Sequence, residues 1–133
     1  MSVNAPNNDL GWLAKDFSLL NVDNNFLSLE EIKGKNGTVI AFICNHCPYV
    51  ISIASRLSSE AEELKKYQIN TIAIMSNDTK KHPDDSFENM IKFSKKYNFN
   101  FPYLFDETQE VAKNYDAVCT PDIYGFNSSL KLM

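Results

Sequence analysis

A strand–helix–strand pattern in the first half of the chain restricts the possible folds most strongly. Residues 38–43 form an almost unbroken apolar run rich in β-branched side chains, which is typical of a strand buried on both faces. Residues 69–75 form a second run of this kind. Between the two runs, apolar residues recur at steps of three and four, as on one face of a helix that ends near residue 67: Val50, Ala54, Leu57, Ala61 and Leu64. The sequence therefore predicts a βαβ unit with two parallel strands.

Shorter patterns on either side of this unit predict the remaining elements. Two apolar stretches around a polar turn indicate an N-terminal β-hairpin over residues 17–20 and 26–29. Two pairs of residues have the spacing of helix capping boxes and predict the starts of two more helices: Asp85 with Glu88, and Asp106 with Gln109. Further strands are expected over residues 101–105, 123–126 and 130–133.

The composition is that of one globular domain, which we expect to span residues 1–133. Hydrophobic residues make up 44% and charged residues 23% of the 133, values that exclude a disordered or fibrous chain. The formal net charge is −4, so we expect no binding surface for nucleic acid or for an anionic membrane. No apolar run is long enough to cross a bilayer, and no signal peptide is visible at the N-terminus. The expected location is therefore the cytoplasm, with an exported protein whose signal peptide has been removed as the open alternative.

The three cysteines carry the main functional signal. They are Cys44, Cys47 and Cys119, and an odd number in a chain of this length argues against a secreted disulfide scaffold. Cys44 and Cys47 form a Cys-x-x-Cys pair where the first strand of the βαβ unit meets its helix. Cys47 lies three residues before Val50 and extends the apolar stripe, so we expect it to be buried. Cys44 is expected at the open helix N-terminus, exposed, with a pKa below the usual value of about 8.5.

These positions predict a division of labour within a redox pair. Cys44 attacks or is attacked, and Cys47 resolves the resulting mixed disulfide. His46, between them, is expected to stabilise the Cys44 thiolate and so make the couple more oxidising. Two other interpretations stay open: the cysteines are small buried residues without a redox role, or they bind a metal together with His46 or His82 and Cys119.

Four segments together resemble the thioredoxin superfamily and, more narrowly, its redoxin (alkyl hydroperoxide reductase/thiol-specific antioxidant) group. They are the Asp-Phe-Ser-Leu segment 16–19, the redox segment 42–50 (Phe-Ile-Cys-Asn-His-Cys-Pro-Tyr-Val), the Ser-Asn-Asp segment 76–78, and the Cys-Thr-Pro-Asp segment 119–122. The resemblance covers nearly the whole chain. It implies an α/β, thioredoxin-like fold: a central mixed sheet flanked by helices, with the N-terminal β-hairpin.

The resemblance also implies a substrate platform. Thr120 and Pro121 match the loop that faces the redox pair in this superfamily, where the proline is cis and the preceding backbone pairs with a bound substrate chain. Cys119 is then expected near the redox pair, either as a third exchange partner or as a small residue that fills space.

The chain departs from the family pattern in three ways. Thioredoxin keeps a buried acid six residues before its first cysteine, and Thr38 stands at that position here. The peroxiredoxin motif Pro-x-x-x-Thr-x-x-Cys would end at Cys47, but Ile40 and Cys44 replace its proline and threonine, and Arg56 lies in the first long helix instead of a later strand. The chain also stops at Met133, where the family continues, so we expect the C-terminal part of the fold to be missing through truncation.

The leading hypothesis is a thiol–disulfide oxidoreductase that exchanges a Cys44–Cys47 dithiol/disulfide with protein disulfides or small thiols. It would need an upstream electron donor and no cofactor beyond its own redox-active disulfide. The first alternative is a peroxiredoxin-like thiol peroxidase. The second is a non-catalytic metal-binding or redox-sensor protein that uses Cys44, Cys47, His46 and Cys119. The direction of electron flow is left open by the sequence.

Overall fold

A mixed β-sheet forms the centre of the molecule. The computed structural model describes residues 12–117 and 120–133. In this part of the chain the sheet has six strands in the order β2-β1-β5-β4-β3-β6. Their bounds are β1 Ser18–Asn21, β2 Phe26–Ser28, β3 Gly37–Phe42, β4 Ile69–Met75, β5 Tyr103–Phe105 and β6 Asp122–Asn127. Strands β3, β4 and β5 are parallel, whereas β1, β2 and β6 pair antiparallel with their neighbours. The expected thioredoxin-like α/β arrangement is confirmed.

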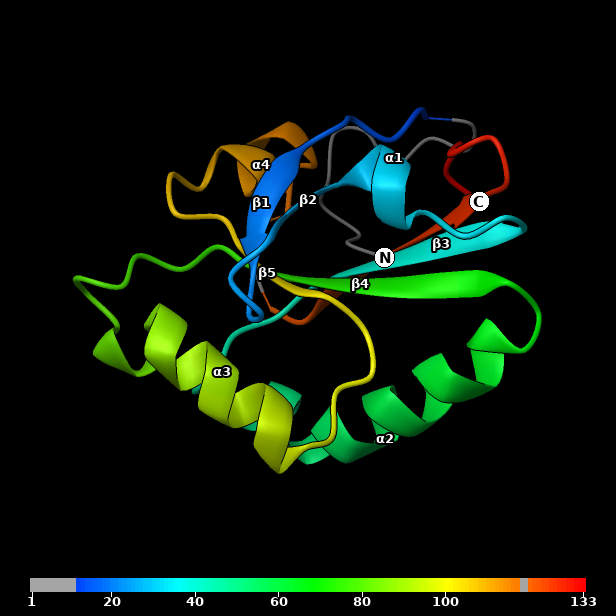
Figure 1. The fold of residues 1–133 in the computed structure, drawn as a ribbon. Helices are drawn as coiled ribbons and strands as arrows, with labels where there is room; N and C mark the ends of the chain where they lie inside the picture. Colours follow the sequence, from blue (N-terminus) through cyan, green and yellow to red (C-terminus); the bar gives the residue numbers. More distant parts are fainter. Residues whose placement is uncertain (1–11, 118–119) are drawn as a thin grey trace.

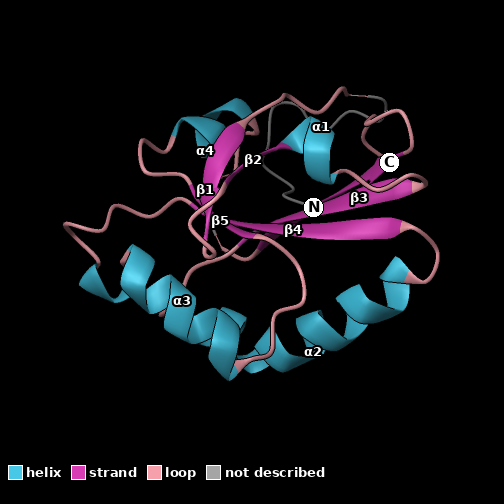
Figure 2. Cartoon of the chain, viewed as in Figure 1, coloured by secondary structure: helices cyan, strands magenta, loops and turns pink. Residues whose placement is uncertain are grey.

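Helices cover both faces of this sheet (Figure 1). The long helices α2 (Pro48–Lys65) and α3 (Phe87–Lys96) lie on one face, and the short helices α1 (Leu29–Ile32) and α4 (Glu110–Asn114) lie on the other. Figure 2 shows the same layers by secondary structure, with the loops that join them. A 3-10 turn, η1 (Pro83–Asp85), precedes α3.

Strand β3 explains why both faces are covered. Ile40 and Phe42 pack into one hydrophobic cluster, and Ala41 and Ile43 pack into the other, because successive side chains of a strand point to opposite faces. Residues 37–42 of β3 pair in parallel register with residues 69–74 of β4, so the predicted βαβ unit is confirmed. The carboxyl end of β3 leads into α2 through the connection that contains Cys44 and Cys47.

Both predicted capping boxes are wrong. Ser86, not Asp85, caps α3, since its hydroxyl accepts the Asn89 backbone N–H at 3.2 Å. At α4, Gln109 and not Asp106 holds the N-cap position, but the Asp106 carboxylate accepts the Ala112 N–H of the first helical turn at 3.0 Å as well as the Ser76 hydroxyl at 2.7 Å. Both aspartates are buried, so each carboxylate also bonds groups outside the helix that it precedes.

Two further differences concern short elements. Helix α1 follows β2 directly and was not expected; Ser28 and Glu31 form its capping box, with Ser28 accepting the Glu31 N–H at 3.3 Å. The segment expected as a last strand, 130–133, forms only isolated bridges, Leu13 with Lys131 and Phe126 with Leu132. In the described ranges, no helix has the length and apolar character needed to cross a membrane.

Candidate active site

Both thiols of the Cys-x-x-Cys pair lie at the carboxyl end of β3. Ile43 still pairs with β4, its N–H donating to the Ile74 carbonyl at 2.9 Å, and helix α2 begins at Pro48. The two cysteines therefore sit in the short connection between strand and helix. Thr120, just before β6, lies opposite them: its hydroxyl is 3.4 Å from the Cys44 sulfur, and its carbonyl accepts the Cys47 thiol at 3.6 Å.

Cys47 is the N-cap residue of α2 and is partly exposed. Desolvation opposes ionisation of its thiol, but the backbone N–H groups of Val50 and Tyr49, with smaller help from Thr120 and the Cys44 thiol, lower its pKa overall. The neutral thiol donates to the Thr120 carbonyl, whereas an ionised sulfur can accept from the free N–H groups of the first helical turn. Cys47 is therefore the thiol that the fold activates.

Cys44 has the opposite environment. Its exposed fraction is 1%, and its side chain belongs to the hydrophobic cluster on the α2 face. Burial raises the pKa of the Cys44 thiol; the Thr120 hydroxyl opposes this shift, and the negative charge of Asp85 reinforces it. The expected exposure and lowered pKa of Cys44, and the expected burial of Cys47, are both wrong.

The start of helix α2 explains why the burial and pKa shifts of the two cysteines are the reverse of those expected. Proline occupies the first helical turn, so the residue before it, Cys47, has extended backbone angles (φ −70°, ψ 122°) and does not continue the helical stripe. Val50 is the first fully buried residue of that stripe. Cys44 instead continues the direction of β3 into the core. Thr38, which stands where thioredoxin has a buried acid, lies near the other end of β3, and its hydroxyl accepts the Gly34 N–H at 3.0 Å.

A different buried acid, Asp85, lies beside the thiols. Its exposed fraction is 0%. Its carboxylate accepts the Asn45 backbone N–H at 2.7 Å and the Asn77 side-chain amide at 2.9 Å, and it lies 2.7 Å from Nδ1 of His46. His46 thus faces Asp85, while its ring stacks on His82 with centroids 4.9 Å apart.

A second set of hydrogen bonds fixes the loop that carries these side chains. The Tyr103 hydroxyl donates to the Asn45 side-chain oxygen at 2.7 Å, and the Asn45 amide donates to the Asp84 carbonyl at 3.1 Å. Burial, aided by the charge of Asp85, raises the pKa of Tyr103 well above its usual value, which keeps the hydroxyl a donor. The sequence analysis assigned no site role to Asn45, Asn77, Asp85 or Tyr103. Asn45 and Asn77 do lie in segments that carry the family resemblance, whereas no sequence signal pointed to Asp85 or Tyr103 as site residues.

The loop before β6 is as the family resemblance implied. The Thr120–Pro121 bond is cis, and Thr120 contacts both sulfurs. Cys119, the third cysteine, lies outside the described residues. The structure therefore brings together Cys44, Cys47, His46 and Thr120 from the predicted set and adds Asp85.

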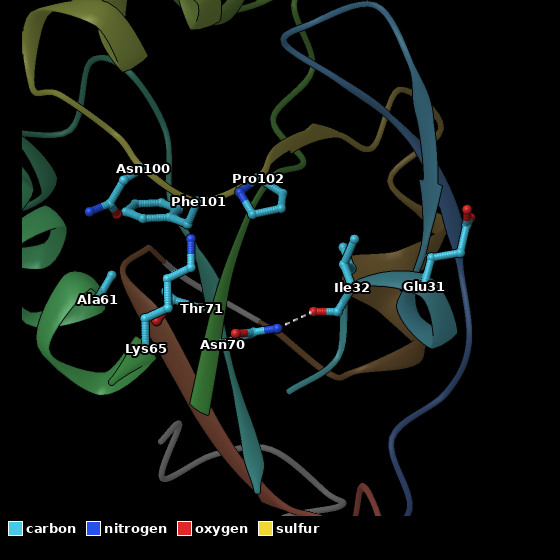
Figure 3. A pocket seen from close by; sticks show the side chains of 9 residues that line it. All are labelled: Glu31, Ile32, Ala61, Lys65, Asn70, Thr71, Asn100, Phe101 and Pro102. Carbon is cyan, nitrogen blue, oxygen red and sulfur yellow. Dashed lines mark hydrogen bonds between the residues drawn. The ribbon is translucent and has the colours of Figure 1, made fainter. Parts of the chain in front are cut away.

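Of two hollows in the described part of the molecule, one opens beside the site and the other lies away from it. One of about 380 Å³ opens beside Thr120 and is lined by Phe42, Ser76, Asn77, Gln109, Ala112, Lys113, Ala117 and Thr120. The other, of about 260 Å³, lies near the start of β4, where the Asn70 amide donates to the Ile32 carbonyl at 3.1 Å (Figure 3). No cysteine or histidine lines this second hollow, so it lies apart from the thiol chemistry.

The fold and the paired thiols at a strand–helix junction define a thioredoxin-like redox enzyme. A sequence profile described as the AhpC/TSA family matches residues 10–131. The chain belongs to the AhpC/TSA family.

Solved structures agree with this assignment. An uncharacterized conserved protein from Geobacillus kaustophilus is 46% identical with a TM-score of 0.93, over 99% of this chain and 71% of that one. A hypothetical protein from Sinorhizobium meliloti is 36% identical with a TM-score of 0.90, over 93% of this chain and 68% of that one. The thioredoxin domain of a thiol-disulfide oxidoreductase from Bacteroides vulgatus shares the fold at 16% identity, with a TM-score of 0.78 over 94% of this chain and 86% of that one. No curated protein sequence matches significantly.

Proposed function

We propose that the protein is a thiol–disulfide oxidoreductase in which Cys47 attacks the substrate and Cys44 resolves the mixed disulfide. The observation that carries this proposal is the placement of the two sulfurs. The Cys47 sulfur is partly exposed at the N-terminus of an 18-residue helix, and the Cys44 sulfur is buried behind it, with Thr120 touching both. Nucleophilic thiols need access and a stabilised thiolate, and of the two described thiols only Cys47 has both.

The first step is attack by the Cys47 thiolate on one sulfur of a substrate disulfide. The positive end of the α2 dipole and the free backbone N–H groups stabilise the thiolate before attack. A bond forms between Cys47 and the attacked sulfur, and the substrate S–S bond breaks. The second substrate sulfur leaves as a thiolate and takes a proton from solvent.

The second step uses Cys44. Its sulfur and the Cys47 sulfur both contact Thr120, at 3.4 Å from the hydroxyl and 3.6 Å from the carbonyl, so the two sulfurs lie close together. Cys44 attacks the Cys47 sulfur, the mixed disulfide breaks, and the departing substrate thiolate takes up the proton that Cys44 loses. The enzyme ends as a Cys44–Cys47 disulfide, and the substrate has received two electrons and two protons.

Thr120 and Pro121 supply the substrate platform in this proposal. The Thr120 carbonyl is 3.6 Å from the Cys47 sulfur, so a substrate chain that pairs with this loop is held next to the nucleophile. The hollow beside Thr120 gives space for the substrate group next to the disulfide. We infer protein disulfides or small disulfides as substrates, no redox group besides the two cysteines, and a separate electron donor that returns the enzyme to the dithiol.

Peroxidase chemistry of the peroxiredoxin type has less support. Arg56, the single arginine of the sequence, lies on the exposed side of α2 and pairs with Glu60 at 3.2 Å. It is therefore turned to solvent, and among the described residues the hydrogen-bond partner of both sulfurs is Thr120, not a cation that could bind peroxide.

A stoichiometric oxidation experiment tests the proposal. Reduced protein is mixed with one equivalent of a disulfide substrate, and the products are counted by thiol titration and mass spectrometry. We expect two substrate thiols released per protein and a Cys44–Cys47 disulfide in the peptide map, and the same result for Cys119→Ser. A stable sulfenate at Cys47 with peroxide, without disulfide exchange, would instead support the peroxidase.

A further inference from the structure

Three different metal-binding side chains converge beside the redox pair. One ligand atom each from Cys44, His46 and Asp85 lies within 4.8 Å of the other two. Cys44 and His46 come from the connection between β3 and α2, and Asp85 comes from η1. We propose that the reduced protein binds a zinc-class transition-metal ion at Cys44, His46 and Asp85.

The donor set selects the class of ion. Thiolate sulfur, imidazole nitrogen and carboxylate oxygen are the three ligand types of zinc sites, whereas magnesium and calcium take oxygen ligands. Zinc–ligand bonds of about 2.0–2.3 Å place neighbouring ligand atoms of a tetrahedral site roughly 3.3–3.7 Å apart. The widest separation, within 4.8 Å, therefore needs to contract by about 1 Å, and the 2.7 Å between His46 Nδ1 and Asp85 Oδ2 needs to widen by about 0.6 Å; rotation of the side chains supplies both changes.

The Asp85 carboxylate is buried and oriented by hydrogen bonds, as expected for a metal ligand. It is fully buried, and hydrogen bonds from Asn45 and Asn77 fix both of its oxygens. Such second partners orient the ligands of metal sites. Within the described ranges, no lysine or arginine lies within ion-pair distance of Asp85, so a bound cation would compensate its charge.

His46 gives an independent indication. Its Nδ1 atom is buried and has no aligned hydrogen-bond partner, although the Asp85 Oδ2 atom lies 2.7 Å away. Buried polar atoms are normally satisfied. A metal ion that binds both atoms accounts for a nitrogen and an oxygen that face each other without a hydrogen bond.

His82 does not belong to the ligand set. Its ring is stacked on that of His46 at an interplanar angle of 15° and a centroid distance of 4.9 Å. A metal lies in the plane of the imidazole that binds it, and these two planes are nearly parallel and offset. His82 therefore packs against the His46 ring, and the fourth position is left to water.

Metal binding and disulfide exchange would exclude each other. The ion needs the Cys44 thiolate, so its binding releases the thiol proton to solvent. A Cys44–Cys47 disulfide removes that ligand. This coupling, unlike the metal site itself, rests on the proposed function.

Cobalt(II) is the probe that tests the site, because thiolate ligation gives it a near-ultraviolet charge-transfer band and tetrahedral ligation gives visible bands. Chelator-treated, reduced protein is titrated with cobalt under argon and then with zinc. We expect one equivalent to bind, with both sets of bands, and zinc to displace it. A wild-type protein without the thiolate band would overturn the proposal.

Variants separate this site from adventitious binding. Cys44→Ser should lose the thiolate band, and Asp85→Asn and His46→Ala should each weaken binding by about tenfold or more. The exposed neighbour Asp84→Asn is the matched control and should bind as wild type. A thiolate band that survives Cys44→Ser, or unchanged affinity in Asp85→Asn, would contradict the assignment. Circular dichroism checks that each variant is folded.

Two further experiments distinguish a failure of the metal site from a failure of the proposed function. Cys47→Ser should still bind cobalt through Cys44 while losing disulfide exchange. Wild-type protein oxidised with one equivalent of disulfide should lose cobalt binding and regain it after reduction. If exchange fails but the reduced protein binds cobalt through Cys44, the proposed function is wrong and the metal site stands.

Discussion

At the scale of single residues, two thiols three positions apart have pKa shifts of opposite direction because helix α2 begins directly after the second of them. Pro48 fixes the start of α2, so Cys47 caps the helix and meets its free N–H groups, while Cys44 remains in the core. The proline was visible in the sequence as a residue suited to the first helical turn. The residue before it is then the cap, but the apolar spacing to Val50 suggested that the helix already included Cys47.

Alkylation rates should report this difference. In reduced protein with chelator present, Cys47 should react with iodoacetamide much faster than Cys44 at neutral pH. The pKa of Cys47 is lowered, so its rate should rise with pH through a midpoint below that of the same thiol in the denatured chain. The pKa of Cys44 is raised, so its rate should stay low until higher pH.

Peptide mapping after timed alkylation measures both rates in one sample. The control is the same chain in denaturant, where the two thiols should react at similar rates. Faster modification of Cys44 in the folded protein would contradict the environments described for the two sulfurs.

At the scale of elements, long periodic patterns predicted strands and helices correctly, whereas short capping patterns did not predict the helix caps. Strands β3 and β4 and helix α2 follow from hydrophobic periodicity, which the tertiary structure reinforces because both sheet faces are covered. The capping spacing of Asp85 with Glu88 misled, because a carboxylate at that position also satisfies the Asn45 N–H from another element. Sequence spacing contains no information on such a contact between residues 40 positions apart.

The cap of α3 can be tested directly. Ser86→Ala should remove the hydrogen bond to the Asn89 N–H and lower the free energy of unfolding by about 1 kcal/mol. The neighbouring cap position of α4, Gln109→Ala, is the control; its side chain makes no capping hydrogen bond, so a smaller change is expected. Urea denaturation measures both variants, and an unchanged midpoint for Ser86→Ala would contradict the assigned cap.

At the scale of the whole molecule, the candidate site is assembled from four separate segments. The β3–α2 connection supplies the thiols and His46, η1 supplies Asp85, the segment after β4 supplies Asn77, and the loop before β6 supplies Thr120. The family resemblance indicated the thiols and Thr120 because their motifs are local. It did not indicate Asp85, whose role depends on how the sheet brings the ends of β3 and β4 together.

The hollow beside Thr120 should influence which disulfides react. Among the described residues that line it, Lys113 is the only charged one. Lys113→Glu should raise KM several-fold for an anionic disulfide such as oxidised glutathione and lower it for cationic cystamine, with kcat little changed. The exposed Lys92→Glu, on α3, is the control. Added salt should reduce the difference, and equal effects on both disulfides would exclude this hollow as the substrate site.

The central claim is that Cys47 attacks and Cys44 resolves, and trapping the mixed disulfide tests it most directly. Cys44→Ser and Cys47→Ser proteins are each incubated with a disulfide substrate, and the adduct is identified by mass spectrometry. The account predicts a stable substrate adduct at Cys47 in the Cys44→Ser protein and none at Cys44 in the Cys47→Ser protein, where the remaining thiol is buried. An adduct that accumulates at Cys44 in the Cys47→Ser protein, with none in Cys44→Ser, would contradict it.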